Sequence, residues 1–156
     1  MNHNVTMIRF KRKSFTSLVN KKNVSLGSEE DLQKQCNDWM NARYPELEKI
    51  FFFNSFQGMY LTHGQRRKAK TTGGLKKGLP DFIFLKNNNK YSGLFIELKK
   101  KTPFLQDGKT LKADDGHLQI QQDVISQLLI EGHYACFCWS LEQFKKTVTD
   151  YMECRL

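Results

Sequence analysis

Residues 78–84, Gly-Leu-Pro-Asp-Phe-Ile-Phe, and residues 95–99, Phe-Ile-Glu-Leu-Lys, decide the fold of this chain. They predict two neighbouring apolar strands, with Asp81 at the start of the first strand. Because strand side chains alternate between faces, Glu97 and Lys99 are expected on one side and Leu98 on the other. Carboxylates inside an apolar strand pair are costly unless they find partners such as a metal ion. Two hard oxygen ligands beside an ammonium group suit a divalent metal, a phosphate and an attacking water.

The flanking sequence predicts an α/β layered domain around a small mixed sheet. Ser28, followed by three acidic residues, predicts the start of a helix that ends near Pro45. Gly132 predicts the end of a second helix over 117–131, and a third is expected to run from Ser140 to about 151. Strands are expected at 50–53, 82–85, 91–98 and 134–139, and a long mobile loop at 57–78. The order helix, three strands, helix, strand, helix gives this fold class.

The charge of the chain favours a polyanionic partner, either nucleic acid or an anionic membrane surface. The 156 residues fit one domain and carry a formal charge of +9, with a pI near 9.4. Six basic and no acidic residues lie in 1–27, and the same is true of 58–80. Such segregation suits a surface that follows phosphates. Residues 1–26 are expected to form a basic arm ahead of a domain over 27–156, although a transit peptide has a similar composition.

The sequence also bears on the location of the protein. It has no run of about 18 apolar residues, so no membrane span is expected. The N-terminus has no apolar stretch behind its basic residues, which argues against a secretory signal. The four cysteines lack zinc-ligand spacing and are expected to be buried, reduced thiols. These features favour a cytoplasmic protein.

Each candidate residue also has a plainer interpretation. Asp81 alone fits a turn aspartate that binds backbone amides, and Glu97 fits a carboxylate on a solvated edge strand or an ion pair with Lys99. The basic residues of 58–80 fit a solvated charge run. His63 and His117 are candidate bases or ligands, but a histidine in a loop usually serves as neither.

Pro80-Asp81, followed at a spacing of sixteen positions by Glu97-Leu98-Lys99, resembles the PD-(D/E)XK nuclease signature. More narrowly, the chain resembles the VRR-NUC family, which is found in phage proteins and in nucleases that act on branched DNA. The resemblance covers about 28–152 and rests on Lys77-Gly78-Leu79-Pro80-Asp81, Gly93-Leu94-Phe95-Ile96-Glu97-Leu98-Lys99, Gln121 eleven residues before Gly132, and Glu29-x-x-Leu32-Gln33. It implies a restriction-endonuclease-like core of a phage-type, stand-alone member.

The resemblance also implies a metal centre. Asp81, Glu97 and the carbonyl of Leu98 would hold Mg²⁺ or Mn²⁺. Glu29 would add a carboxylate, either directly or through water, and Glu30 is an equal candidate because one residue on a helix rotates the side chain by about 100°.

Two further residues complete the catalytic set that the resemblance implies. Lys99 would act on the nucleophile, and Gln121 would hydrogen-bond Lys99 or the surroundings of the scissile phosphate. Gln119 and Gln122 compete with Gln121, but Gln121 alone has the family spacing.

The expected activity is that of a Mg²⁺-dependent endodeoxyribonuclease, a hydrolase that is structure-specific and resembles Holliday-junction resolvases. Its expected partners are branched DNA and a second copy of the chain, with no membrane, in the bacterial host cytoplasm if the protein is phage-encoded. A nuclease or nickase on linear duplex DNA and a non-catalytic nucleic-acid-binding protein stay open as alternatives. The DNA backbone is expected to contact six basic residues: Arg66, Arg67, Lys68, Lys76, Lys77 and Lys100.

Overall fold

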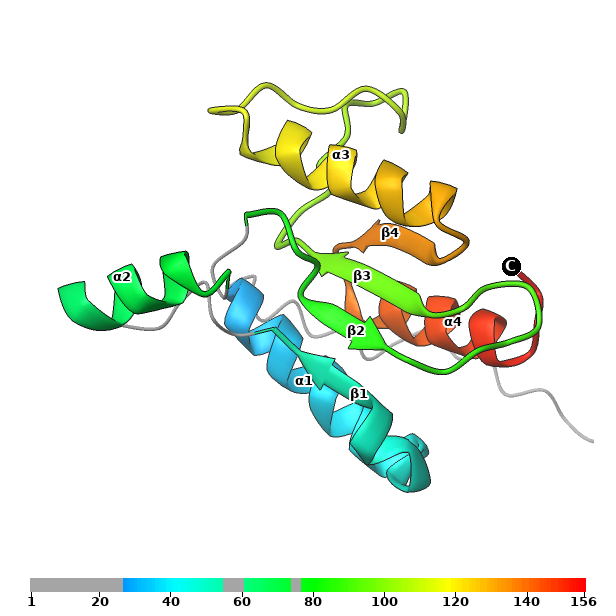
Figure 1. Cartoon of the computed structure of the whole chain (residues 1–156). Helices are drawn as coiled ribbons and strands as arrows, with labels where there is room; N and C mark the ends of the chain where they lie inside the picture. The colour runs from blue at the N-terminus through cyan, green and yellow to red at the C-terminus, as the bar shows by residue number, and fades with distance from the viewer. Residues whose placement is uncertain (1–26, 55–60, 74–76) are drawn as a thin grey trace, which may run out of the picture.

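The computed structural model describes residues 27–54, 61–73 and 77–156 (Figure 1). The basic arm predicted at 1–26 and the predicted DNA contact Lys76 lie outside the described residues. The elements follow the chain as α1 (Glu29–Arg43), the 3₁₀ helix η1 (Pro45–Ile50), β1 (Phe51–Phe53), α2 (His63–Thr71), β2 (Phe82–Phe84), β3 (Leu94–Leu98), α3 (His117–Ile130), β4 (Tyr134–Cys138) and α4 (Leu141–Met152).

The four strands form one mixed sheet in the order β1-β2-β3-β4. β2 is antiparallel to both β1 and β3, whereas β3 and β4 are parallel and joined through α3. The helices α1 and α4 pack on one face of the sheet and α3 lies over the other (Figure 1). This arrangement confirms the predicted α/β fold around a small mixed sheet.

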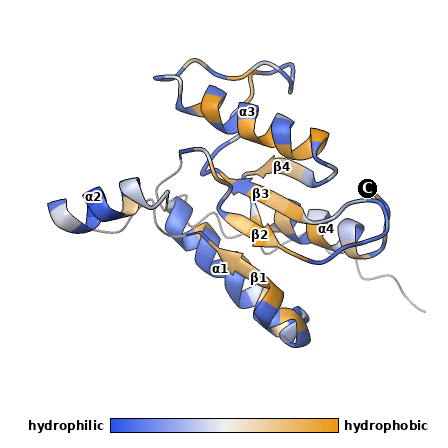
Figure 2. Ribbon diagram, viewed as in Figure 1, coloured by the Kyte–Doolittle hydropathy of each residue, from blue (hydrophilic) through white to orange (hydrophobic). Residues whose placement is uncertain are grey.

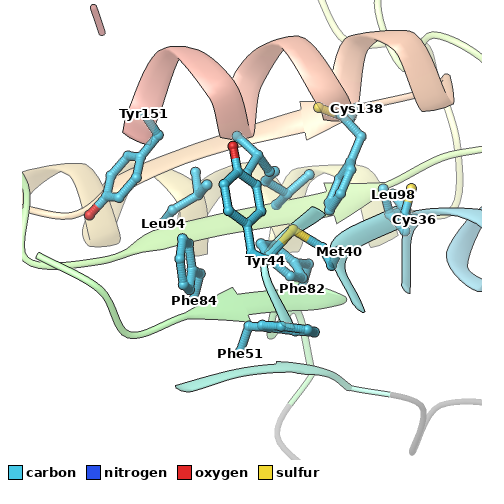
Figure 3. Close-up of a cluster of buried hydrophobic side chains, with 13 residues drawn as sticks. Cys36, Met40, Tyr44, Phe51, Phe82, Phe84, Leu94, Leu98, Cys138 and Tyr151 are labelled. Carbon is cyan, nitrogen blue, oxygen red and sulfur yellow. The ribbon is translucent and has the colours of Figure 1, made fainter. Parts of the chain in front are cut away.

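The larger core lies between the sheet and the pair α1 and α4. Apolar residues from all three meet there, among them Met40, Phe82, Phe84, Phe144 and Tyr151, each completely buried (Figure 3). Figure 2 shows that hydrophobic residues gather along the strands and on the helix faces that cover them. A smaller core around Ile125, Ala135 and Phe137 holds α3 against the opposite face.

The first strand begins one residue later than predicted and ends at Phe53 as predicted. Ile50 belongs to η1, which the sequence did not predict, and the strand begins at Phe51. Phe51 is buried as expected. Phe52 points to the opposite face of the sheet, which α3 does not cover at β1, and it is 48% exposed. The strand predicted here therefore contributes Phe51 to the core and leaves Phe52 exposed.

The segment 57–78 also differs from its prediction as a loop, because residues His63–Thr71 form the helix α2. The Thr62 hydroxyl accepts a hydrogen bond from the Gln65 N–H, and the Gln65 side chain accepts one from the Thr62 N–H. This reciprocal capping satisfies backbone groups at the first turn and so helps the helix to begin. The sequence carried that signal in Thr62-x-x-Gln65, but the surrounding glycines and the lack of an apolar period concealed it.

The other helix boundaries agree with the sequence. Ser28 caps α1 in a reciprocal pair with Asp31, and three acidic residues occupy the first turn as predicted. Gly132, with φ of 79°, follows the last turn of α3 and takes the left-handed conformation that glycine allows.

Two more predictions concern the cysteines and the membrane. All four cysteines are free, and Cys36 and Cys138 are buried as expected, but Cys136 is only partly buried and Cys154 is exposed. Over residues 27–54, 61–73 and 77–156, no helix combines the length and the apolar character that crossing a membrane requires.

Candidate active site

The candidate site lies where β2 begins and β3 ends. Phe82 of β2 is paired with Ile96 of β3, and extending this antiparallel register by one residue sets Asp81 opposite Glu97. Residues directly opposite in an antiparallel pair point to the same face. That face is the one that α3 covers, since Glu97 is paired on its other side with Phe137 of the α3 core. The two predicted carboxylates therefore lie side by side on one face of the sheet, Asp81 just before β2 and Glu97 in β3.

Glu97 is a buried carboxylate with one bonded and one unbonded oxygen. Its exposed fraction is 2%. Oε1 accepts hydrogen bonds from Lys99 Nζ at 2.8 Å and from Gln121 Nε2. Among the described residues, Oε2 has no hydrogen-bond partner although it is buried. Such an oxygen is costly to bury and marks a place where a cation or a donor belongs.

Lys99 follows Glu97 by two residues and lies on the same side, as strand alternation predicts. Its side chain is 14% exposed, and its ammonium group pairs with Glu97. Leu98, between them, is buried in the core on the opposite face. The Leu98 N–H donates to Asp81 Oδ2 at 2.9 Å. The contact seen at Leu98 is thus made by its N–H, while a metal contact through its carbonyl stays a prediction.

Both carboxyl groups resist ionisation in this environment. Burial raises the pKa of Glu97 to about 8, and the neighbouring charge of Asp81 adds to the effect, against the opposing charge of Lys99. Burial also raises the pKa of Asp81, although the hydrogen bond from Leu98 and the charge of Lys99 lower it. Two carboxylates that repel each other in a buried place are stabilised by a shared cation.

The structure distinguishes between the two glutamates that begin α1. Glu29 Oε1 accepts a hydrogen bond from the Lys100 N–H at 3.1 Å, which ties the first turn of α1 to the chain just past β3. Its charge also raises the pKa of Asp81 and of Glu97. Glu30 instead lines a groove of about 640 Å³ between α1 and β1. Of the two, Glu29 is the one beside the strand carboxylates.

Gln121 is the glutamine that reaches the site. It is 1% exposed and donates to Glu97, whereas Gln119 bonds Asp123 and Gln122 bonds Ser126 on the outer side of α3. Of the three glutamines, the one with the family spacing is thus the one that contacts Glu97. Its contact is with Glu97 rather than with Lys99, which the resemblance implied as one option.

His117 is a neighbour of the site that the sequence argument undervalued. Its Nε2 lies 3.1 Å from the Nε2 of Gln121, and Gln121 is one turn further along α3 than His117. The Gln121 amide has two hydrogens, so it donates one to Glu97 and one to His117, whose Nε2 then accepts. The i, i+4 spacing of His117 and Gln121 was the signal in the sequence. His63, by contrast, lies on α2.

The predicted DNA contacts divide into two groups. Arg66, Arg67 and Lys68 are exposed on α2, which stands clear of the sheet on the side where β3 ends (Figure 1). Lys77 and Lys100 are exposed on the main body, and Lys100 adjoins Glu29. The structure therefore gathers Asp81, Glu97, Lys99, Gln121 and Glu29, and it leaves the α2 cations apart from them.

The residues of the site fit a hard divalent cation. Among the described residues, no group of three or more His, Cys, Asp or Glu side chains forms a ready metal centre. Mg²⁺, however, binds through one or two carboxylates and keeps several waters. Asp81, Glu97 with its unbonded Oε2, and nearby Glu29 supply this kind of donor set, which contains oxygen and no sulfur.

No protein-family model matches the sequence, and neither does any curated protein. Among solved structures, a VRR_NUC domain protein superposes with a TM-score of 0.59 at 19% identity, over 81% of this chain and 89% of that chain. The chain has the fold of that VRR_NUC domain protein. At this identity the likeness confirms the expected fold and does not extend to the activity.

Proposed function

We propose that this protein is a metal-dependent endodeoxyribonuclease that hydrolyses DNA phosphodiester bonds. The observation that carries the proposal is Glu97, buried in an apolar strand beside Asp81 and Lys99, whose Oε2 has no hydrogen-bond partner within the described part of the chain. A purely structural ion pair would not need a second carboxylate opposite the first. The VRR_NUC fold supports the same conclusion.

Each residue has a role that follows from its contacts. Asp81 and Glu97 would hold Mg²⁺ or Mn²⁺, with Glu29 and the Leu98 carbonyl as further donors. When bound, the metal supplies Lewis-acid stabilisation of charge on the phosphate and a more acidic water. Lys99 donates one hydrogen to Glu97, and its remaining hydrogens can orient the attacking water or neutralise a phosphate oxygen. Gln121 holds the Glu97 carboxylate in one orientation.

The proposed substrate is branched DNA, in the manner of a Holliday-junction resolvase, and the proposed assembly is a homodimer. The formal charge of +9 supports a DNA substrate, and a two-fold symmetric junction calls for two symmetric sites. We also propose a phage-type, stand-alone enzyme that works in a host cytoplasm. Sedimentation at several protein concentrations tests the dimer, and a monomer at every concentration would refute it.

A cleavage assay tests the activity. Four-way junction, flap and linear duplex DNA are each incubated with Mg²⁺, with Mn²⁺ or with EDTA. Metal-dependent cutting that favours the junction is expected. Equal cutting of all substrates would indicate the nuclease or nickase on linear duplex DNA. Binding without cutting in any metal would indicate a non-catalytic binding protein.

A matched pair of variants tests the site. Glu97→Gln keeps the shape of the side chain but removes its charge, so cleavage should fall by about a thousandfold or more while DNA binding persists. Glu142→Gln makes the same change on α4, where the side chain is 83% exposed, and should cut as the unaltered protein does. If Glu97→Gln also cuts normally, the assignment of the site is wrong.

A further inference from the structure

The helix α2 has no place in the core, and this sets it apart from the other helices. None of its nine residues is buried, and it stands clear of the sheet in Figure 1. Figure 2 shows it as mostly hydrophilic. A helix of this length is marginal in water by itself, and like charges four residues apart, such as those of Arg66 and Lys70, weaken it further. Its capping pair, Thr62 and Gln65, helps the helix to begin.

The cations of α2 have a helical period. His63, Arg66, Arg67 and Lys70 follow the spacing i, i+3, i+4, i+7, so about 100° of rotation per residue places them within an arc of about 100°. Lys68 lies about 100° or more away from each of its neighbours in this stripe. Within the described part of the chain, none of the α2 cations forms an ion pair with an acidic side chain. We call the four residues the basic stripe.

The basic stripe restricts the kind of partner. A helix that lies on a membrane surface needs an apolar face, and α2 has none. A stripe about 10 Å long with three full cations matches a repeating row of single negative charges, such as the phosphates along a duplex. Neutralising the cations would also remove the repulsion that weakens the helix.

The geometry points to α2 as a docking helix for the phosphate backbone of a duplex DNA arm, bound through the basic stripe and away from the carboxylates. This inference rests on the proposed function and deepens it, because it names the surface that holds the uncut arm. Lys70, which was not among the DNA contacts predicted from the sequence, belongs to that surface. Lys68, which was among them, lies off the stripe, beside a hollow that it lines together with His63 and Arg67.

The test compares two lysines on the same helix. Binding of a fluorescent linear duplex is measured against salt concentration in the Glu97→Gln background, which prevents cleavage. Lys70→Gln should weaken binding about three- to fivefold and lower the slope of log affinity against log salt by about one. Lys68→Gln makes the same change of charge off the stripe and should cost less than half as much. Equal losses for both lysines, or none at Lys70, would overturn the inference.

A second measurement does not depend on a variant. Amide hydrogen exchange over residues 63–71 should slow by about tenfold when duplex DNA is added, because docking stabilises the backbone hydrogen bonds of the helix against opening. Unchanged exchange with saturating DNA would overturn the inference. Slowing with an acidic protein but not with DNA would also overturn it, in favour of a protein partner.

The outcomes separate this inference from the proposed function. If the unaltered protein cuts DNA but Lys70→Gln binds normally, the inference that α2 docks DNA is wrong, and the proposed nuclease function is supported. If Lys70→Gln weakens binding but no metal supports cutting, the docking helix stands and the nuclease is wrong.

Discussion

A carboxylate placed in the middle of an apolar strand must be stabilised locally, and the contacts of Glu97 show how this is done. Lys99 and Gln121 both donate hydrogen bonds to Oε1. No donor among the described residues reaches Oε2. Two donors on one oxygen hold the group in one orientation. A group so oriented, with its other oxygen unbonded, is prepared for a ligand that arrives from outside the chain.

The helix glutamate is the residue whose role the sequence left open, and the structure allows it to be tested. We predict that Glu29→Gln lowers the rate of metal-dependent cleavage about ten- to a hundredfold, because it removes a carboxylate charge beside Asp81 and Glu97. The amide oxygen of the new side chain still accepts from the Lys100 N–H, so the fold should persist. Single-turnover cleavage with Mg²⁺ measures the effect.

The neighbouring glutamate provides the control for this prediction. Glu30→Gln makes the same change one residue along α1, in the groove beside β1. It should leave the cleavage rate within about twofold of the unaltered protein, since surface changes are usually small. A larger loss at Glu30 than at Glu29 would reverse the assignment.

At the scale of elements, the sequence correctly predicted the features that follow from strand periodicity and helix capping. Strand alternation correctly placed Glu97 and Lys99 on one side, and Ser28 and Gly132 correctly marked helix ends. Periodicity could not reveal α2, because a helix with no buried residue has no apolar period. The choice of Glu29 over Glu30 depends on how α1 approaches β3. That approach is set by long-range packing, which no local pattern in the sequence contains.

Gly78 shows how one element positions the site. With φ of 80° it takes a left-handed conformation, and an added Cβ would lie 3.0 Å from Ile120 Cγ2 and 3.2 Å from the Ile120 carbonyl oxygen. The chain therefore passes close to α3 immediately before Asp81. The glycine of the Gly-x-Pro-Asp motif has a physical reason in this close approach.

We predict that Gly78→Ala lowers the free energy of unfolding by about 2 to 3 kcal/mol, from backbone strain plus the clash with α3. Gly73→Ala is the matched control, because Gly73 has φ of 74° and no atom within 4 Å of an added Cβ. It should cost about 1 kcal/mol or less. Urea unfolding of both variants measures the difference, and equal losses would show that contact with α3 does not constrain the motif.

At the scale of the whole molecule, the site weakens the fold that carries it. A carboxyl whose pKa is raised to about 8 favours the protonated form in the folded protein, whereas in the unfolded chain it ionises near its ordinary value of 4.5. Its contribution to stability is therefore fully present below about pH 4.5 and is lost as the pH rises through about 8. The metal-free protein should become less stable over that window.

We predict that in EDTA the midpoint of thermal unfolding falls by roughly 10 °C more between pH 5 and pH 8 in the unaltered protein than in Glu97→Gln. The variant lacks the titrating carboxyl, so the pH dependence of its unfolding midpoint comes only from the other ionisable groups. The difference between the two proteins is then due to Glu97. Adding Mn²⁺ at pH 8 should restore much of the loss in the unaltered protein and none in the variant, because only the charged carboxylate gains from a bound cation. Parallel curves for the two proteins in EDTA would mean that Glu97 is ionised throughout and that its burial costs the fold little. No Mn²⁺ effect in either protein would argue instead against a cation between Asp81 and Glu97.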